Sequence, residues 1–552
     1  MKKLKNSINA PWFSVLKTAL VALPLMFVSC LDENPKDRIT ENEAYSSASS
    51  LYVNTVSTLY NYIGGNADSQ GLQGTYMGVY DYNTFTTDEA MLPTRGGDWY
   101  DGGFWQNLYT HRWTPNDNAL GATWDYLYKV VVLCNKSLAA IDKHQSLLTS
   151  AQHEAYTAEV RAVRAMFYWY IMDLFGNVPV VTDTDIAPND VTQSSRSKVF
   201  EFIVNELQAV IPSLPDEHSN LEGEYYGRVT RPVAYFIMAK LALNAEIYTD
   251  DDWTDGTHNS GKDIMFTIDG ERVNAWQTVV KYCAKLKNSG YALASDYASN
   301  FAVHNETSKE NIFTIPMDKT LYANQFHYLF RSRHYAHGSA LGMDSENGTS
   351  ATLSTVNAYG YGTKNEDKRY AVNFYSGQVE VDGKPVLLDN GNPLVYEPLA
   401  VKLDLTGDRY EKTAGARMAK YEIDRTAHAD GKLQDNDIVL FRYADILLMA
   451  AEAKTRNGDD GSAELNEVRS RAGMEPRSCT LDNILTERLL ELMCEGWRRQ
   501  DLVRYGLFTG AYDQRTPVDG EDTGYTTVFP IPDKVLELNR ALKQNPGYKT
   551  IE

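Results

Sequence analysis

The most constraining feature of this 552-residue chain is one long segment, residues 149–175, that is predicted to be a helix with apolar residues on nearly every side. Thr149 and Gln152 have the spacing of a capping box at its start, and Gly176, Asn177 and Pro179 mark its end. Apolar residues recur around it: Val160, Val163, Met166, Phe167, Tyr170, Ile171 and Leu174. A helix that is apolar all round has to be buried among other elements. The segment therefore predicts helices packed around helices.

Other periodic segments extend this prediction to most of the chain. We expect helices at 44–62, 117–141, 198–211, 232–248, 275–288, 441–456, 463–471 and 481–505. Pairs joined by a few Gly or Asp residues resemble tetratricopeptide (TPR) hairpins, although no strict 34-residue period is present. Residues 64–115 and 296–437 are instead rich in loops, with strand-like runs at 312–315 and 395–403. The predicted fold is mainly α: a TPR-like helical-hairpin scaffold with a loop-rich ligand-binding face.

The first 29 residues have the pattern of a secretory signal peptide. Lysines come first, an apolar run follows at 19–28, and the small residue Ser29 precedes Cys30. Pro24 and the shortness of the run argue against a membrane-spanning helix, which needs about 20 apolar residues. A cysteine at this place resembles the bacterial lipoprotein cleavage site, which implies lipidation at Cys30. We therefore expect a signal peptide at 1–29 and an acylated tether at 30–43.

Net charge limits the partners of the protein. The chain has a formal charge of −20, and removing the four lysines of the leader makes the remainder −24. This charge repels nucleic-acid phosphates and anionic lipid, and it argues against polyanionic substrates. We expect no nucleic-acid partner and a membrane anchor that consists of acyl chains alone.

No cofactor, metal or catalytic motif stands out. The cysteines that follow Cys30 form no CxxC pair, so free buried thiols are expected rather than metal or redox use. The spacing of His327, His334 and His337 fits no zinc motif. The sequence favours a protein without enzymatic activity, cofactor or bound metal.

Four segments carry a resemblance to a known family. In one-letter code they are RAVRAMFYWY at 161–170 with FGNVP at 175–179, FRYADILLMAAE at 441–452, ERLLELMCEGWRRQDLVR at 487–504, and FPIP at 529–532 with QNPGY at 544–548. Their order and spacing resemble the SusD/RagB family of outer-membrane nutrient-uptake lipoproteins, over essentially the whole chain after the leader. The resemblance implies a SusD-like N-terminal helical region at 44–295 and a RagB/SusD C-terminal region at 296–552.

The same resemblance implies a function. Members of the family bind glycans at the cell surface and form a lid on a SusC-like TonB-dependent transporter in the outer membrane. We therefore expect a lipid-anchored, surface-exposed protein that captures an oligo- or polysaccharide and delivers it to that partner.

The acidic residues Glu487, Glu491 and Glu495 lie four apart, together with Arg499, and are expected to share one helix face. They could be catalytic carboxylates, or they could form a charge network that ties helices together through Arg488, Arg498 or Arg504. The second interpretation needs no cleft and no perturbed pKa, and we favour it.

The resemblance places a first binding loop just after Thr87-Asp88-Glu89, at residues 91–103. Candidates there are Arg95, Asp98, Trp99 and Tyr100, which combine aromatic faces with groups that can bind sugar hydroxyls. Alternatively, Trp99 and Tyr100 pack the loop and Asp98 pairs with Arg95. Both interpretations remain open at this stage.

A second candidate segment, residues 324–337, is rich in rings and amides. It lies where the family usually contributes another binding aromatic. The candidates are Asn324, Phe326, Tyr328, His334 and Tyr335. The lack of a tryptophan near residues 347–349, where the starch-binding founder has one, argues against starch as the ligand.

Two rival functions remain. A secreted helical glycoside hydrolase or lyase would need two carboxylates facing each other in one groove. A structural or peptide-loading lid for the transporter would bind no glycan at all. Release of reducing ends tests the first rival, and affinity electrophoresis against glycans tests the second.

Overall fold

A computed structural model describes residues 41–65, 70–321 and 331–549. Residues 41–44 form a short helix, α1 (Glu41–Ala44), in a unit apart from residues 45–552. The predicted signal peptide, the lipidation site Cys30 and the candidates Asn324, Phe326 and Tyr328 lie outside the described residues. The division at residues 295 and 296 stays a prediction.

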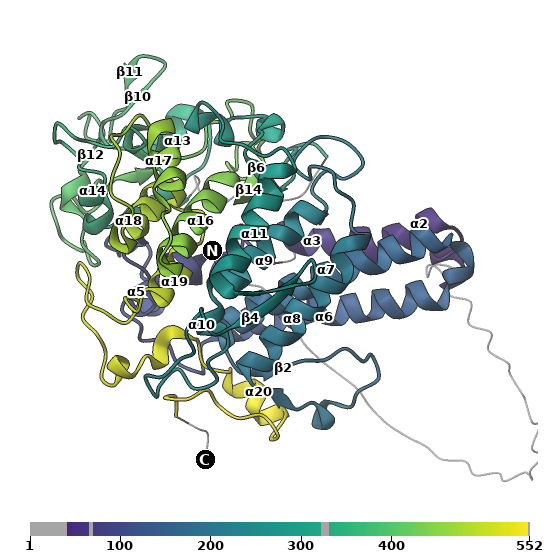
Figure 1. The fold of residues 1–552 in the computed structure, drawn as a ribbon. Helices are drawn as coiled ribbons and strands as arrows, with labels where there is room; N and C mark the ends of the chain where they lie inside the picture. The colour runs from purple at the N-terminus through teal and green to yellow at the C-terminus, as the bar shows by residue number, and fades with distance from the viewer. Residues whose placement is uncertain (1–40, 66–69, 322–330, 550–552) are drawn as a thin grey trace, which may run out of the picture. The chain divides into compact units, whose positions relative to one another are not determined.

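The N-terminal half is built mainly of helices (Figure 1). Its elements are α2 (Ala48–Tyr52), a π-helical turn (Val53–Ser57), α3 (Thr58–Gly64), α4 (Val79–Thr84), α5 (Phe104–Tyr109), α6 (Asn118–Lys143), α7 (Ser150–Phe175), α8 (Arg196–Val210), α9 (Arg231–Leu243), α10 (Ala245–Tyr248) and α11 (Ala275–Asn288). Helices α6 and α7 lie side by side, and α8 packs against α7.

Helix α7 confirms the buried helix predicted for residues 149–175. The Thr149 side chain accepts a hydrogen bond from the backbone N–H of Gln152, and the Gln152 side chain accepts one from the backbone N–H of Thr149. The capping box is therefore formed. From Ala158 to Phe175 every residue except Arg161 is buried. The helix is therefore enclosed by its neighbours, as an all-round apolar surface requires.

The C-terminal scaffold repeats the packing of helix on helix. Its helices are α13 (Tyr335–Leu341), α14 (Leu353–Ala358), α15 (Tyr370–Asn373), α16 (Tyr443–Asn457), α17 (Ser462–Arg471), α18 (Leu481–Leu492), α19 (Arg498–Arg504) and α20 (Asp533–Leu538). Helix α11 packs against both α9 and α16, and α16 packs against α17 and α18. The scaffold is thus mainly α and consistent with TPR-like pairs.

The predicted single helix over 481–505 is wrong. Helix α18 ends at Leu492, and α19 begins at Arg498. Between them the backbone of Cys494 has φ 64° and that of Gly496 has φ 78°, a left-handed conformation that a helix cannot contain. Glu495 therefore does not share a helix face with Glu487 and Glu491.

Strands in the described residues form only two-stranded antiparallel sheets. The pairs are β1 (Ala90–Met91) with β7 (Ser350–Ala351), β2 (Val178–Pro179) with β3 (Gln193–Ser194), β4 (Met265–Ile268) with β5 (Glu271–Asn274), β6 (Asn311–Ile315) with β14 (Ile438–Arg442), β8 (Phe374–Tyr375) with β13 (Arg417–Met418), β9 (Gly377–Gln378) with β12 (Val395–Tyr396), and β10 (Glu380–Val381) with β11 (Lys384–Pro385). The predicted strand at 395–403 ends early, because a 3-10 turn at Pro398–Ala400 follows β12.

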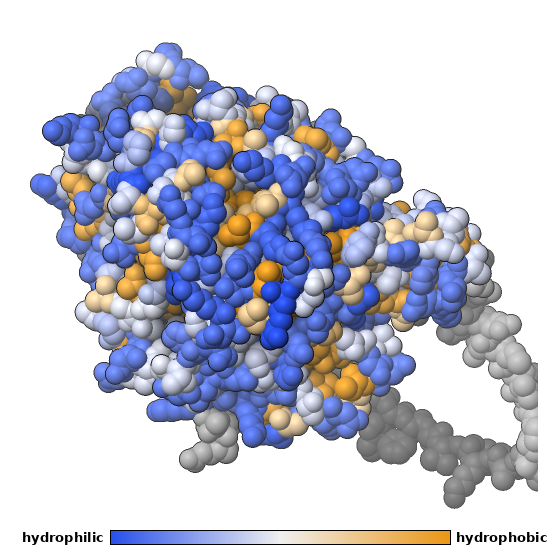
Figure 2. Space-filling model, viewed as in Figure 1, coloured by the Kyte–Doolittle hydropathy of each residue, from blue (hydrophilic) through white to orange (hydrophobic). Residues whose placement is uncertain are grey.

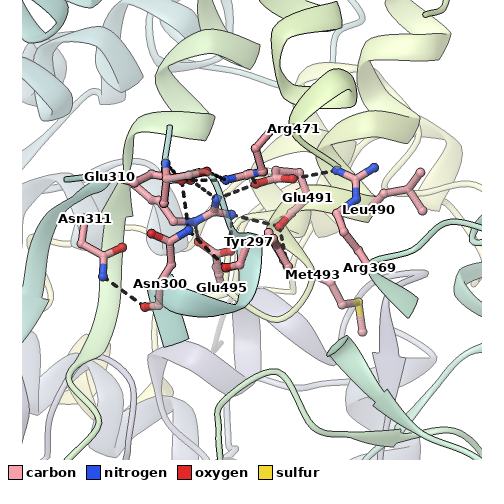
Figure 3. A network of polar contacts seen from close by, with 12 residues as sticks. Tyr297, Asn300, Glu310, Asn311, Arg369, Arg471, Leu490, Glu491, Met493 and Glu495 are labelled. Atoms are coloured by element: carbon pink, nitrogen blue, oxygen red, sulfur yellow. Dashed lines mark hydrogen bonds and ion pairs between the residues drawn. The ribbon is translucent and has the colours of Figure 1, made fainter. Parts of the chain in front are cut away.

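A buried charge network ties β14 to α17 and α18 (Figure 3). Arg442 bonds Glu310 and Glu491 at 2.5 Å and Glu495 at 2.7 Å. Arg471 reaches Glu310 and Glu491 as well. The structural interpretation of these acids is confirmed, but the predicted partners are wrong. The arginines that bind Glu487, Glu491 and Glu495 come from other elements rather than from 488, 498 or 504.

Hydrophilic residues predominate on the face shown in Figure 2, and hydrophobic ones are scattered among them. Among the helices of the described residues, none combines the length and the apolar character that crossing a bilayer requires.

Candidate ligand-binding site

Strand pairing brings the predicted binding loop beside two distant segments. Strand β1 pairs with β7, so residues 91–103 start next to residues 345–351. The backbone N–H of Thr94 donates to the carbonyl of Leu403, which adds the segment 403–414. Loops from both predicted regions of the chain therefore meet at one place.

A hollow of about 450 Å³ opens at this meeting point. Its lining combines aromatic rings with charged groups: Tyr76, Asp98, Trp99, Asp101, Tyr335, Glu346 and Lys432. Asp98, Trp99 and Tyr335 were candidates from the sequence, and the fold brings them together although 237 residues separate Asp98 from Tyr335.

Trp99 is held firmly while it lines this hollow. Its indole Nε1 donates to the carbonyl of Glu346 at 2.7 Å, and its ring meets Trp105 edge-on at 5.8 Å. Any Cβ at Gly348 would lie 2.6 Å from the ring, so only glycine fits against it. Trp99 therefore packs its loop and lines the hollow at once, and the two interpretations drawn from the sequence are compatible.

Tyr335 and Asp98 form the junction between the two candidate segments. The Tyr335 hydroxyl donates to Asp98 at 2.8 Å, and the Lys412 ammonium binds the same carboxylate oxygen at 2.7 Å. Partial burial works against ionisation of Asp98, but these two hydrogen bonds lower its pKa. Burial and the bond to Asp98 raise the pKa of Tyr335 to about 12. The Tyr335 side chain remains 45% exposed, so its ring is available to a ligand.

Sequence reasoning missed four residues of the hollow. Tyr76 and Trp105 both donate to the carboxylate of Asp101, which fixes the Tyr76 ring at the edge of the hollow. Tyr76 lies in the loop-rich stretch 64–115, a signal that could have pointed to it. Burial raises the pKa of Glu346. Glu346 and Lys432 come from the loop-rich insert, and nothing in their local sequence distinguishes them.

Arg95 does not reach the hollow, and this corrects its predicted place. It is fully buried, and its guanidinium donates to Ser350 Oγ at 2.8 Å and to the carbonyls of Ala414 and Glu411. Asp98 pairs with Lys412 instead of Arg95, so the alternative pairing is also wrong.

Tyr100 and His334 stand apart from the hollow in different ways. Tyr100 is 55% exposed, and it does not line the hollow. His334 is the N-cap of α13, where its Nδ1 accepts from the backbone of Ala336 at 3.0 Å. Burial, together with Arg417 and Arg95, lowers the pKa of His334 to about 4, so this ring is neutral at pH 7.

A larger groove of about 930 Å³ adjoins the hollow at Tyr335. One wall is the start of α13, with His334 and Tyr335, and the other is the segment 381–390. That segment includes the β10–β11 hairpin, which stands out at the top of Figure 1. Lys412 lines the groove and bonds Asp98 of the hollow, so the two depressions form one continuous surface.

The chemistry of this surface suits a polar ligand with flat faces. Exposed tyrosine rings can pack against C–H surfaces, and the charged groups around them can bind hydroxyls. Among the described residues, no group of three or more His, Cys, Asp or Glu side chains gathers to hold a metal ion. The four cysteines in the described part of the chain are free, as expected, although Cys479 is only half-buried.

Comparison with known families identifies relatives of both halves of the chain. A model described as SusD family matches residues 287–548, and one described as starch-binding associating with outer membrane matches residues 69–243. The starch-binding protein SusD of Bacteroides thetaiotaomicron is 24% identical over 522 residues, which cover 87% of each chain. A SusD-like protein of Bacteroides ovatus is 24% identical over 504 residues, covering 87% of this chain and 80% of the relative.

Solved structures share the fold. Surface glycan-binding protein A from Bacteroides thetaiotaomicron, in complex with laminarihexaose, matches with a TM-score of 0.68 at 23% identity, covering 89% of this chain and 98% of the other. Surface glycan-binding protein A from Bacteroides uniformis matches with a TM-score of 0.67 at 21% identity, covering 90% and 98%.

Proposed function

The chain belongs to the SusD/RagB family, and from that premise we propose that it captures an oligo- or polysaccharide at the cell surface. The observation that carries the proposal is the hollow, in which Tyr76, Trp99 and Tyr335 place aromatic rings around charged groups. Sugar rings have apolar C–H faces, which pack against aromatic rings, and many hydroxyls, which bind charged groups.

The relatives support the same ligand class. One is named for starch binding, and another was solved with laminarihexaose, a glucan oligosaccharide. The identity of 24% or less leaves the particular glycan of this chain open to assay.

Delivery and location complete the proposal. We propose that acyl chains at Cys30 anchor the protein to the outer membrane, where it hands the glycan to a SusC-like TonB-dependent transporter. The family resemblance and the lipoprotein-like leader support this arrangement. A lid that binds no glycan, or that loads peptides, is the rival that glycan-binding assays test.

The hollow also bears on the rival of a glycoside hydrolase. Asp98, Asp101 and Glu346 line it, and glycoside hydrolysis needs two carboxyl groups, one to donate a proton and one to attack the sugar or activate water. The Asp98 carboxylate is bound by Lys412 and Tyr335, and that of Asp101 by Tyr76 and Trp105. Of the three, Glu346 alone has no such pair of donors among the described residues, and we propose that the protein binds glycan without cleaving it.

Binding assays on the purified protein test this function. We expect affinity electrophoresis or calorimetry with a panel of oligosaccharides, laminarihexaose and maltohexaose among them, to show binding of at least one member, and no release of reducing ends. Tyr335→Ala should weaken binding about tenfold, or about 1.4 kcal/mol, through loss of an exposed ring. Leu538→Ala, which alters an exposed side chain of α20, is the matched control and should bind like wild type. Cleavage of any glycan, or an unchanged affinity of Tyr335→Ala, would contradict the proposal.

A further inference from the structure

Three buried arginines near the large groove have no acidic partner. Arg95, Arg333 and Arg417 are each at most 1% exposed, and none forms an ion pair with a described residue. Arg417 donates to the carbonyls of Ser332 at 3.2 Å and Lys412 at 3.0 Å. Two guanidinium nitrogens of Arg333 have no hydrogen-bond partner among the described residues.

This arrangement is exceptional in the molecule. Every other buried arginine of the described chain lies within 4.0 Å of a carboxylate. They are Arg164, Arg196, Arg331, Arg369, Arg442, Arg469, Arg488, Arg498, Arg499, Arg504 and Arg515. A buried cation without a counter-charge is costly, so its concentration at one place calls for a reason.

Two of the unpaired arginines, Arg417 and Arg95, lie close to the wall of the groove. His334 is a groove wall, and its backbone N–H donates to the hydroxyl of Tyr396 at 2.9 Å. The Tyr396 ring lies 5.1 Å from the guanidinium of Arg417. Lys412 binds the carbonyl oxygen of Arg95 at 2.7 Å. The charges of Arg417 and Arg95 therefore reach the groove wall, where burial and these charges lower the pKa of His334.

The lining itself adds further cations. Lys384 lines the groove with an exposed ammonium group, and Lys412, whose ammonium is bound to Asp98, lines it as a half-buried cation. Of the acids there, Asp382 is paired with Arg425 at 3.0 Å, whereas Asp389 has no ion pair among the described residues. The lining holds two lysines and two aspartates, so the excess of positive charge around the groove comes from the buried arginines, although the whole chain has a net charge of −20. Fields inside a cleft with low-dielectric walls follow the nearest charges rather than the net charge.

From these observations we infer that the groove is a subsite for an acidic group of the glycan, a carboxylate or a sulfate, while neighbouring rings of the same ligand contact Tyr335. This inference rests on the proposed glycan-binding function and specifies its substrate class. It also departs from the expectation, drawn from the net charge, that the chain avoids polyanionic substrates, because a short oligosaccharide meets the local field of the groove.

An oligosaccharide array tests the inference on the purified protein. The array holds uronate-bearing, sulfated and neutral oligosaccharides, with each acidic member matched by its carboxyl-reduced or desulfated form. We expect the tightest ligands to be acidic, and neutralising their acid groups to weaken binding about tenfold. The uronate and sulfate arms show which of the two acid groups is bound.

Variants of the exposed lysines sharpen the test. Lys384→Gln should weaken acidic ligands several-fold, with a loss that shrinks as salt rises from about 20 to 200 mM, and should leave neutral ligands unchanged. Lys198→Gln, on the exposed surface of α8, is the matched control and should change neither. Tight binding of neutral glycans with no gain from acid groups would overturn this inference and leave glycan binding intact. Binding of no glycan at all would overturn the proposed function itself.

Discussion

Buried arginines have opposite surroundings in two regions of this molecule. In the scaffold, Arg442 is bonded to the carboxylates of Glu310, Glu491 and Glu495, and Arg471 to those of Glu310 and Glu491; Figure 3 shows Arg471 with these acids. Near the groove, Arg95, Arg333 and Arg417 contact carbonyls, hydroxyls or rings and form no ion pair with a described residue.

The difference separates structural charge from charge that can act on a ligand. In the scaffold each cation is neutralised inside the protein, so its field hardly reaches solvent. Near the groove the field is not cancelled and extends to the surface where Tyr335 and Lys412 lie. The comparison therefore predicts that disturbing the first region changes stability, and that disturbing the second changes binding.

The largest expected effect is a loss of unfolding free energy when an arginine of the scaffold is replaced. Arg442→Met leaves three buried carboxylates without their shared counter-charge and should cost about 3–5 kcal/mol of unfolding free energy, or prevent folding. Arg417→Met is the matched variant, because it removes an equally buried arginine that has no acidic partner. It should cost about 1–3 kcal/mol through unsatisfied carbonyls. Denaturant unfolding of both variants checks this, and equal losses would contradict the comparison.

The next largest effect should come from acid, which should lower the stability of the scaffold, where buried arginines are paired with carboxylates. Burial opposes ionisation, but Arg504 and Arg456 lower the pKa of Glu452 to about 2, against an ordinary value of 4.5. A carboxylate with a lowered folded pKa stabilises the protein above pH 4.5, and this contribution is lost as the pH falls toward 2. We expect a loss of about 2 kcal/mol from this one group, measured by urea unfolding between pH 7 and pH 3.

Glu452→Gln provides the check on that assignment. The variant should be less stable than wild type at pH 7 and should lose less stability on acidification. Glu201→Gln, which changes an exposed glutamate of α8, should follow the wild-type curve. If Glu452→Gln and wild type lose stability in parallel, the ion pairs of Glu452 do not supply the pH dependence.

Substitution of Trp99 should have a smaller effect, on both stability and glycan affinity. Trp99→Ala removes the bond to Glu346 and the contact with Trp105, which should cost about 1–3 kcal/mol of stability and a similar amount of glycan affinity. Trp99→Phe keeps an aromatic face but loses the indole N–H, so it should retain more binding than stability. Melting curves and calorimetry on both variants measure the two losses. A normal affinity in folded Trp99→Ala would exclude the ring as a sugar platform.

The smallest effect is expected at Tyr100. Its side chain is exposed in the same loop, yet it does not line the hollow. Tyr100→Ala should therefore change stability and glycan affinity by less than about 0.5 kcal/mol. A loss of affinity comparable to that of Tyr335→Ala would extend the site beyond the hollow toward Tyr100.

Local signals in the sequence predicted the scaffold well. Caps, stop residues and apolar periodicity located α6, α7 and α11 within two residues of their ends. They failed at the break between α18 and α19, because the backbone N–H of Cys494 is bonded by Glu89 from a distant loop. A long-range contact of that kind leaves no periodic trace near residue 494.

The site was predictable only in part, for the same physical reason. Asp98, Trp99 and Tyr335 could be named because their residue types suit sugar recognition. Arg95 belongs to the same tetrad by composition, but the fold buries it under residues 348–350. Glu346 and Lys432 enter the hollow through loop packing alone, which the order of residues along the chain does not reveal.

The most direct test of the central claim is a crystal structure of the protein with its tightest oligosaccharide. We predict one sugar ring against Tyr335 and Trp99 in the hollow, and an acidic group of the ligand in the groove near Lys384 and Lys412. A glycan bound elsewhere, for example in the pocket between Tyr52 and Tyr226, would contradict it.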